Sequence, residues 1–412
     1  MIYFTELRRL PVLDPAGRRL GRVVDLVLLP DGDRRRVSKL VVRAGTRRLE
    51  VPADAVIDVS GGGIRISREA GQLAEFSPQA DDLLAARHLL DRQVIDIRSR
   101  QVVRVNDLGF LEEQANGRCE LRLAEVDAGT RSAFRRLFEG LLSSRTVRRV
   151  NDRLAQHALA WETVELIEAS AERRRNWSIN HQKLAGLHPT DLADIVEELA
   201  PAEREAIFQT LDDTISAHAL AELKRNVQRC VIEALPRPRA ARLLEAMAPD
   251  QAADLLAHLP HKAAEAILEA MRRTDAAEIE ELLEFPRNTA GGMMTTRYIR
   301  VPAAESVQGA IQALFAGREA AAASCSIFLV DGDERLAGAI PIARLLLYPP
   351  GTPLARLRMD PPLSVAARAS DDEVVEMFER HRLLSLPVVD ERRRLIGVIR
   401  ADDVIALLKS RL

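Results

Sequence analysis

The sequence is poor in cysteine, lysine and aromatic residues. Its 412 residues include 3 cysteines, which lie far apart at Cys119, Cys230 and Cys325. This spacing gives neither a Cys-x-x-C metal motif nor a disulfide framework, so the chain is not a disulfide-stabilised secreted protein. Lysines are rare, arginines are many, and the formal net charge is −2. A near-neutral balance argues against bulk binding to nucleic acid, and we expect no nucleic-acid partner.

Long apolar runs are also absent. No stretch approaches the roughly eighteen apolar residues of a membrane helix, and the N-terminal MIYFTELRRLPVLD has no signal-peptide core. We therefore expect a soluble, cytoplasmic chain without a transmembrane segment. The sequence contains no H-E-x-x-H, no phosphate-binding P-loop, no G-x-S-x-G and no Cys/His pair at metal spacing. These absences predict that the protein is not an enzyme.

What is present is a twelve-residue repeat that runs from His188 to Leu283. The eighth and twelfth positions are almost always apolar, and with positions five and nine they form the i, i+3, i+4, i+7 stripe of one helix face. Twelve residues at roughly 100° each overshoot three turns by about 120°, so one continuous helix would not keep this stripe on one face. Prolines at the first or second position of five repeats supply the breaks. We predict a stack of short helices, with N-caps at third-position residues such as Thr190, Thr214 and Asp250.

Strand patterns precede the repeat. Residues 1–76 show β-branched alternation between turn signals, which predicts a small β-barrel. Their segment DPAGRRLGRVVDLVLL, followed by VSKLVVR, resembles the PRC-barrel family. A second copy is predicted at 82–169, with an amphipathic insert at 132–144 that packs on the barrel or contacts a membrane. Polar residues 170–186 predict a linker.

The repeat and the residues after it resemble the cytoplasmic part of MgtE-type magnesium channels. LHPTDLADIVEEL, APDQAADLLAHLP and LLEFPRNTAGGMMTT are close to signatures of that family, which places its N-domain at 187–290. Residues 291–351 and 352–412 resemble a tandem pair of CBS domains, as in LSVAARASDDEVVEMFERHRLLSLPVVDERRRLIGVIRADDVIALL. The predicted fold class is multidomain α and α+β, with small N-terminal β-barrels, a right-handed α-superhelical repeat domain and a C-terminal CBS pair. Channel members continue into a membrane pore, so we expect a regulatory half without the gate.

Asp250 and Asp254 are the sharpest candidate metal pair. At spacing i, i+4 they share a helix face and are close enough to hold one hydrated divalent ion. An N-cap at Asp250 and a solvated Asp254 would also explain the pattern. The MgtE resemblance implies that acids of this P-D-x-A-A-D motif bind regulatory Mg2+ across to the CBS domains, where Asp403 and Asp372 match.

Basic residues replace several acids that the family carries near this position, namely Arg382, Lys409 and Arg411. Fewer carboxylates imply fewer Mg2+ sites, of which we expect one or two to remain. Arginines that bridge to the acids directly would instead make a closed state that needs less magnesium.

The CBS resemblance also implies an adenine-nucleotide site. CBS pairs that bind AMP or ATP carry G-h-h-[ST]-x-x-D, with the hydroxyl on phosphate and the acid on ribose. The second copy keeps Gly397 and Asp403 but has Arg400 at the hydroxyl position. These three residues are candidate nucleotide ligands, or Asp403 simply caps the last helix.

These resemblances predict a regulatory protein that responds to Mg2+ or another divalent cation through its repeat and CBS domains. We expect it to control a separately encoded membrane transporter, at the inner membrane face, and to form a homodimer because CBS pairs usually associate face to face. An adenine-nucleotide energy sensor is the first alternative. An RNA- or ribosome-associated adaptor is the second, because PRC barrels occur in ribosome maturation factors.

Overall fold

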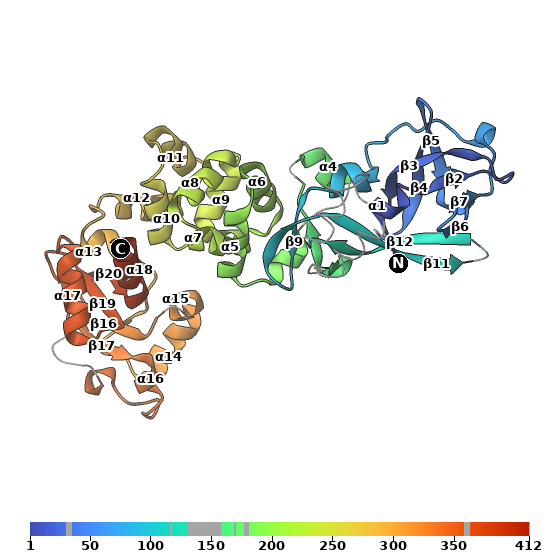
Figure 1. Ribbon diagram of the computed structural model, residues 1–412. Coiled ribbons are helices and arrows are strands. Elements are labelled where there is room, and N and C mark those ends of the chain that lie inside the picture. Colours follow the sequence, from blue (N-terminus) through green and yellow to red (C-terminus); the bar gives the residue numbers. More distant parts are fainter. Residues whose placement is uncertain are drawn as a thin grey trace. The chain divides into compact units, whose positions relative to one another are not determined.

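The computed structural model describes residues 1–29, 35–115, 118–129, 158–168, 170–176, 181–322, 324–357 and 363–411. The amphipathic insert predicted at 132–144 lies outside these residues. The chain divides into two units, Met1–Ile215 and Ser216–Leu412, which are described one after the other. Figure 1 labels their helices and strands.

The largest sheet of the first unit has the strand order β5-β4-β3-β2-β7-β6, with β8 beside β3. Its strands are β2 (Pro11–Leu13), β3 (Arg19–Leu28), β4 (Val37–Ala44), β5 (Arg47–Pro52), β6 (Val56–Ser60), β7 (Gly63–Ile66) and β8 (Leu83–Leu84). Tight turns join the short strands, and Gly17 and Gly45 adopt positive φ angles of 77° and 64° there. Alternate residues such as Leu26, Leu40 and Ile64 point inward and are buried. The strand-rich region predicted at the N-terminus is confirmed.

Two smaller sheets follow in the same unit. One has the order β1-β11-β12-β13 and the other β10-β9-β14. Their strands are β1 (Ile2–Tyr3), β9 (Gln93–Asp96), β10 (Gln101–Arg104), β11 (Asp107–Ala115), β12 (Arg118–Asp127), β13 (Ala158–Ala160) and β14 (Val164–Leu166). Single turns of helix lie between strands of all three sheets of this unit: α1 (Phe4–Leu7), η1 (Ala53–Ala55), η2 (Ala70–Gln72), η3 (Ala85–Leu89) and η4 (Trp161–Thr163).

The two predicted barrel regions share one apolar core. Strand β1 pairs with β11, so the N-terminal residues enter a sheet of the second region. One cluster of buried side chains includes Phe4, Leu40, Phe110 and Val164. The boundary predicted between residues 76 and 82 therefore does not separate two cores.

The predicted linker at 170–186 is anchored where the structure describes it. It contains α4 (Ala171–Asn176) and η5 (Gln182–Gly186). The nearly buried Arg174 donates to the carbonyl of Glu168 and to Gln209, at 2.8 and 2.7 Å. Lys183 donates to the carbonyls of Glu162 and Val164 at 3.0 and 2.9 Å. A polar composition suggested a solvated segment, but its basic side chains satisfy backbone carbonyls instead.

The repeat folds into one short helix per twelve residues. The helices are α5 (Pro189–Glu198), α6 (Pro201–Thr210), α7 (Asp213–Glu222), α8 (Arg225–Ala234), α9 (Arg237–Ala246), α10 (Pro249–Leu256), α11 (His261–Leu268) and α12 (Arg273–Leu283). Helices α5 and α6 belong to the first unit and α8 to α12 to the second, and the division falls within α7. Every eighth-position residue is buried: Ile195, Ile207, Ala219, Val231, Leu243, Leu255, Ile267 and Ile279. The predicted register is confirmed.

The predicted N-caps are wrong by two positions. The helices begin at the second position of the repeat, where Pro189, Pro201 and Pro249 are the first helical residues. The third-position residue is therefore the second residue of the helix. The cap of α5 is His188, whose ring nitrogen accepts the N–H of Thr190. Asp250 is therefore not a cap, and its carboxylate is left for other contacts.

The C-terminal residues form two similar subdomains, called here the first and second CBS copies after the resemblance of their sequence. The first contains β15 (Arg300–Pro302), α14 (Val307–Ala316), α15 (Arg318–Ala322), β16 (Ser326–Val330), β17 (Leu336–Pro341) and α16 (Ile342–Leu345). After η6 (Leu354–Arg356), the second contains β18 (Val365–Ala366), α17 (Asp371–His381), β19 (Ser385–Val389), β20 (Leu395–Arg400) and α18 (Ala401–Arg411). In both copies the first strand is parallel to the second, and the second is antiparallel to the third. The predicted order of strands and helices is confirmed, with α15 as an addition.

The segment between the repeat and the first CBS copy is bound to the second copy. It contains α13 (Ala290–Met293), where Ala290 and Gly291 donate to the carbonyls of Ala369 and Ala367, each at 2.8 Å. Thr295 exchanges two backbone hydrogen bonds with Val398. A Cβ on Gly291 would lie 2.4 Å from the Phe285 ring, so this close approach requires glycine. Among the residues described, no helix has both the length and the apolar character to cross a membrane.

Candidate functional site

Helix α10 carries two carboxylates on the face that its apolar residues leave free. Ala252, Leu255 and Leu256 are buried, and α10 packs against α8, α9 and α12. Asp250 and Asp254 lie on the other side of this helix and line a hollow in the second unit. Asp250 sits in the first turn, where the helix dipole favours a negative charge.

The hollow has a volume of about 540 Å³ and is lined by helices of the repeat and of the second CBS copy. Four carboxylates line it, from three helices: Asp250 and Asp254 of α10, Asp371 of α17 and Asp403 of α18. The structure thus brings together three of the four predicted metal residues. The fourth, Asp372, is 81% exposed at its side chain and its neighbour Asp371 lines the hollow instead.

Asp250 is the most buried of these acids, with 13% of its side chain exposed. Burial raises its pKa, and the nearby charge of Asp403 raises it further. A hydrogen bond from the Thr295 side chain and the charge of Arg400 act in the opposite direction without cancelling the rise. Its Oδ1 atom is buried and has no hydrogen-bond partner within the described residues.

Arg400 links the acids of two helices. Its backbone N–H, Nε and Nη2 donate to the carboxylate of Asp403 at 3.1, 3.2 and 3.2 Å. Its Nη2 also lies 4.0 Å from Oδ2 of Asp250. Burial alone would lower the pKa of Arg400, but the hydrogen bonds and charge of Asp403 raise it. This guanidinium therefore remains a cation between the two carboxylates.

Two further arginines pair with the remaining acids. Arg287 lies 3.6 Å from Asp254 through its Nη2 atom. Arg411, near the end of α18, donates to both Asp371 and Asp372, and its bond to Asp372 measures 2.8 Å. The hydrogen bonds that Arg411 donates to Asp372 and Asp371 raise its pKa. Every carboxylate around the hollow thus has a guanidinium neighbour.

A ready-made metal cage is not present among the described residues. No group of three or more His, Cys, Asp or Glu side chains there is arranged to hold a metal ion. The oxygens that a hydrated divalent cation would find are Oδ1 of Asp250 and the carboxylate of Asp254, which is 52% exposed. Such a set fits Mg2+ only as a weakly held ion that keeps most of its water ligands.

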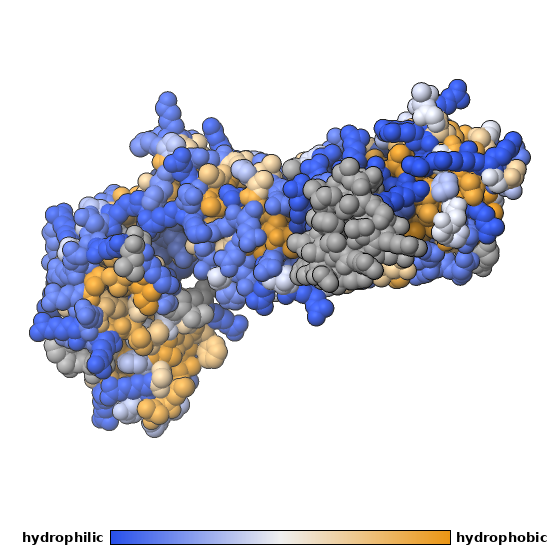
Figure 2. All heavy atoms as spheres, in the orientation of Figure 1, coloured by the Kyte–Doolittle hydropathy of each residue, from blue (hydrophilic) through white to orange (hydrophobic). Residues whose placement is uncertain are grey.

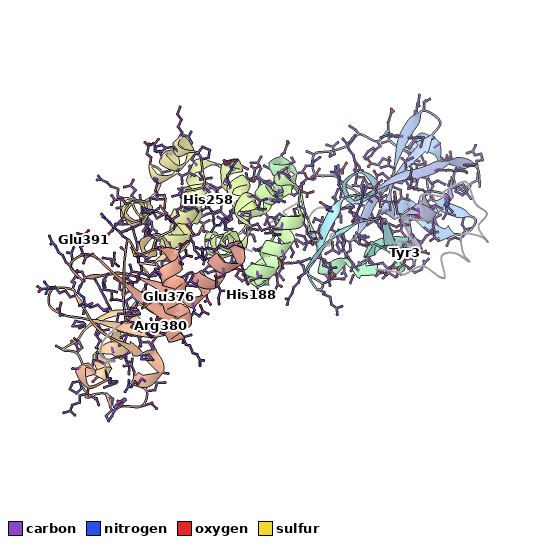
Figure 3. The ribbon with its side chains drawn as sticks, turned by 60° about the vertical axis from the view of Figure 1, so that its left-hand side comes forward. Tyr3, His188, His258, Glu376, Arg380 and Glu391 are labelled. Atoms are coloured by element: carbon purple, nitrogen blue, oxygen red, sulfur yellow. The ribbon has the colours of Figure 1, made fainter. Side chains whose placement is uncertain are left out.

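His258 completes the hollow on the side of the repeat (labelled in Figure 3). Its Nδ1 lies 2.8 Å from Nη2 of Arg287 and 2.6 Å from the carbonyl of Asp254. Its Nε2 lies 3.4 Å from Nη1 of Arg225. These residues were not predicted from the sequence, because no local pattern indicates that positions 33 and 29 residues apart meet at one ring.

A second, smaller cleft of about 100 Å³ lies between the CBS copies. Arg297, Tyr298, Ser324 and Arg400 are among its lining residues. Of the three predicted nucleotide ligands only Arg400 lines it. Gly397 packs against Met294, whose Sδ would lie 2.4 Å from an added Cβ.

Family models match three parts of the chain. Residues 1–73 match the PRC-barrel domain, 187–288 the MgtE intracellular N domain, and 355–410 the CBS domain. The magnesium transporter MgtE of Bacillus subtilis is 29% identical over 221 residues, which are 53% of this chain and 49% of that protein. That of Thermus thermophilus is 28% identical over 230 residues, 55% of this chain and 51% of that protein.

Solved structures agree with these matches. The cytosolic domain of the Mg2+ channel MgtE in complex with ATP is 25% identical, with a TM-score of 0.52 over 58% of this chain and all of that one. The soluble part of a magnesium transporter has the same fold, with a TM-score of 0.53 at 23% identity over 58% of this chain and 92% of that one. The chain spans about half the length of the curated relatives it matches. Three regions of the chain therefore match the PRC-barrel, MgtE intracellular N and CBS domain models, and the chain is similar to the cytosolic domain of MgtE.

Proposed function

We propose that the repeat helices and the CBS copies form a regulatory module whose arrangement responds to Mg2+ or another divalent cation. The observation that carries this proposal is the gathering of Asp250, Asp254, Asp371 and Asp403 around one hollow. Carboxylates brought this close repel one another, so a cation that enters favours the arrangement in which they are close. The relatives named as magnesium transporters support Mg2+ as that cation.

The arginines supply part of the positive charge that this arrangement needs. Arg400 and Arg287 lie 4.0 and 3.6 Å from the two acids of α10. The arginines then hold the repeat helices and the second CBS copy together in part without metal. Mg2+ at millimolar concentrations stabilises this arrangement further. Weak affinity is expected because Mg2+ surrenders its waters reluctantly and meets one or two carboxylates here.

Two native cysteines allow a direct test on the intact chain. Cys230 on α8 and Cys325 beside β16 are exposed, whereas Cys119 is buried and resists labelling. Spin labels at the two exposed positions report the distance between the repeat and the first CBS copy by double electron–electron resonance. Millimolar Mg2+, added at constant ionic strength so that screening does not change, should narrow and shorten this distance distribution.

Variants separate a bound ion from a general salt effect. Asp250→Asn combined with Asp254→Asn should remove the Mg2+ response. Asp333→Asn, at a 75% exposed turn residue that does not line the hollow, should retain it. Identical distance distributions with and without Mg2+ in the parent protein would leave the module a static scaffold.

Adenine-nucleotide binding in the smaller cleft is the second candidate function. Arg297 and Arg400 offer positive charge there, and Tyr298 packs edge-on against Phe328 within the same lining. The MgtE cytosolic domain whose structure contains ATP supports this candidate. Calorimetric titration with ATP and AMP tests it, and absence of heat with both nucleotides would exclude it.

We further propose that the module acts in the cytoplasm, at the inner membrane face, on a separately encoded magnesium-transporting membrane protein, and that it works as a homodimer. The names of the relatives support the first part. Exposed apolar side chains on helices of the CBS copies, Phe315, Ile405 and Leu408 among them, support the second. Figure 2 shows apolar surface over this part of the chain. Co-purification with membranes tests the first part, and sedimentation velocity tests the second.

A further inference from the structure

The hollow is lined by guanidinium groups as well as by carboxylates. Arg225 begins α8 and Arg287 lies in the segment after α12, yet both guanidinium groups approach the ring of His258, at 3.4 and 2.8 Å. Gln228 and Asn288 also line the hollow, although the amide nitrogen of Gln228 already donates to the carbonyls of Leu220 and Ala221. Arg225 forms no ion pair in the part of the chain that the structure describes. Its charge is therefore available to a ligand.

The imidazole cannot satisfy both arginines. A neutral histidine ring has one N–H and one acceptor nitrogen. If Nδ1 donates to the Asp254 carbonyl at 2.6 Å, then Nε2 accepts from Arg225, and Arg287 faces an N–H rather than an acceptor. If Nδ1 instead accepts from Arg287, then Nε2 carries the hydrogen and faces Arg225. In either tautomer one of the two guanidinium groups faces an N–H of the ring. The donor that it points at the ring then has no acceptor there.

A metal ion alone or an anion alone would bind only weakly in this hollow. Its four acids are balanced by Arg225, Arg287, Arg400 and Arg411, so the site as a whole is near neutral. A bare divalent ion finds too few carboxylates, and a bare polyphosphate would face Asp250 and Asp403. Mg2+ in proteins is commonly held by one or two carboxylates together with phosphate oxygens and water. A complex of the two ions offers negative oxygens to the guanidinium groups and a positive ion to the carboxylates.

We propose that the hollow binds the Mg2+ complex of a polyphosphate, with phosphate oxygens on Arg225 and Arg287 and the ion facing Asp250 and Asp254. Guanidinium groups suit phosphate because they offer several donors in one plane. The volume of about 540 Å³ lies within the range of roughly 300–1,000 Å³ typical of small-ligand sites. This inference rests on the proposed function, since it names the ligand through which the same hollow responds to magnesium.

Inorganic pyrophosphate is the probe, because it has no base to occupy the cleft between the CBS copies. The intact chain is titrated with pyrophosphate by calorimetry, with and without Mg2+. Ionic strength is the same in both titrations. In the titration with Mg2+ the free Mg2+ concentration is held constant, since pyrophosphate itself chelates magnesium. We expect binding that requires Mg2+. Equal affinity without Mg2+ would overturn the proposal in favour of a simple anion site.

Charge-removing variants locate the phosphate. Arg225→Gln and Arg287→Gln should each weaken Mg·pyrophosphate binding about tenfold, the usual effect of losing one hydrogen bond to a charged group. Arg229→Gln is the matched control, because this residue is on the same helix, pairs with Glu233 at 3.2 Å and does not line the hollow. Unchanged affinity in both hollow variants would overturn the proposal.

Two further outcomes separate the ligand's source from the proposed function. If Arg225→Gln weakens the binding of Mg·ATP, a nucleotide is supported as the source of the polyphosphate. If Mg·ATP binds equally well to this variant and pyrophosphate does not bind at all, the hollow is not the site. If Mg2+ alone shortens the Cys230–Cys325 distance and Mg·pyrophosphate does not bind, the regulatory function stands and this inference fails. If Mg·pyrophosphate binds with the expected dependence on both arginines but the distance does not change, the site stands and the regulatory function fails.

Discussion

The two faces of α10 contact the rest of the protein through different kinds of interaction. Its inner face places Leu255 and Leu256 against neighbouring repeat helices, where the stabilisation grows with the apolar area removed from water. Its outer face places Asp250 and Asp254 beside Arg400 and Arg287 at 4.0 and 3.6 Å. Ion pairs at these distances on a partly exposed surface contribute little stability each. The inner face therefore fixes the fold, and the outer face is free to change its partners.

The largest effect should come from a charge on the inner face. Leu255→Asp places an unpaired carboxylate at a position with 3% exposure, and we expect a loss of several kcal/mol in the free energy of unfolding. Ala257→Asp, at the exposed end of the same helix, is the control and should cost less than about 0.5 kcal/mol. Urea denaturation measures both. A Leu255→Asp protein that unfolds at the midpoint of the parent would contradict the assigned register.

The second largest loss of stability should come from a steric clash between Gly397 of β20 and Met294, which follows α13. A Cβ at Gly397 of β20 would lie 2.4 Å from Sδ and 2.8 Å from Cβ of Met294. Since the Cβ of Met294 cannot rotate away, Gly397→Ala should cost about 1–3 kcal/mol. Met294→Ala removes Sδ and Cγ but keeps the Cβ at 2.8 Å, so it should relieve only part of this cost in the double variant, which a double-mutant cycle measures. Additive costs would show that the glycine is needed for another reason, such as ligand binding.

The inner faces of the repeat helices were predictable because burial leaves a periodic record in the sequence. Each eighth-position residue from Ile195 to Ile279 is buried as the twelve-residue stripe requires. The caps were not predicted, since proline as the first helical residue moves the start of the helix by two positions. The shared core of the N-terminal strands was also missed. Pairing of Ile2 with Phe110 is a long-range contact that no local pattern records.

The outer face was predicted only in part. The spacing of Asp250 and Asp254 indicated one acidic face, and the resemblance brought Asp403 to it. The partners Arg287, Arg225 and His258 come from segments that meet only in the folded chain. Charge pairs carry no periodicity, so their geometry depends on the tertiary structure.

Removing the bridging cation should have an intermediate effect on stability. Arg400→Gln loses the charge that binds Asp403 and approaches Asp250, and we expect a cost of about 1–2 kcal/mol. The Mg2+ response in the Cys230–Cys325 distance should grow, because two carboxylates are released for the ion. Arg394→Gln, which breaks the exposed turn pair with Asp390, should change neither property by much. A weaker Mg2+ response in Arg400→Gln would mean that the guanidinium assists the ion rather than replacing it.

The smallest change in stability should come from Asp250→Asn, although it removes a charge from the most buried acid. Burial raises the pKa of Asp250, so the fold favours its protonated form, which asparagine resembles in shape and charge. The stabilising contribution of that protonated form is complete below the unfolded value of 3.8 and is lost as the pH rises through the folded pKa. At neutral pH the variant should therefore be as stable as the parent or slightly more stable, within about 1 kcal/mol or a few degrees in Tm. As the pH falls through the folded pKa, the parent should gain on the variant, and thermal melts at fixed ionic strength across this range measure the difference. A parent that is clearly more stable at neutral pH would show that its charge is needed by Arg400, and the two faces of α10 would then contribute to the fold in similar measure.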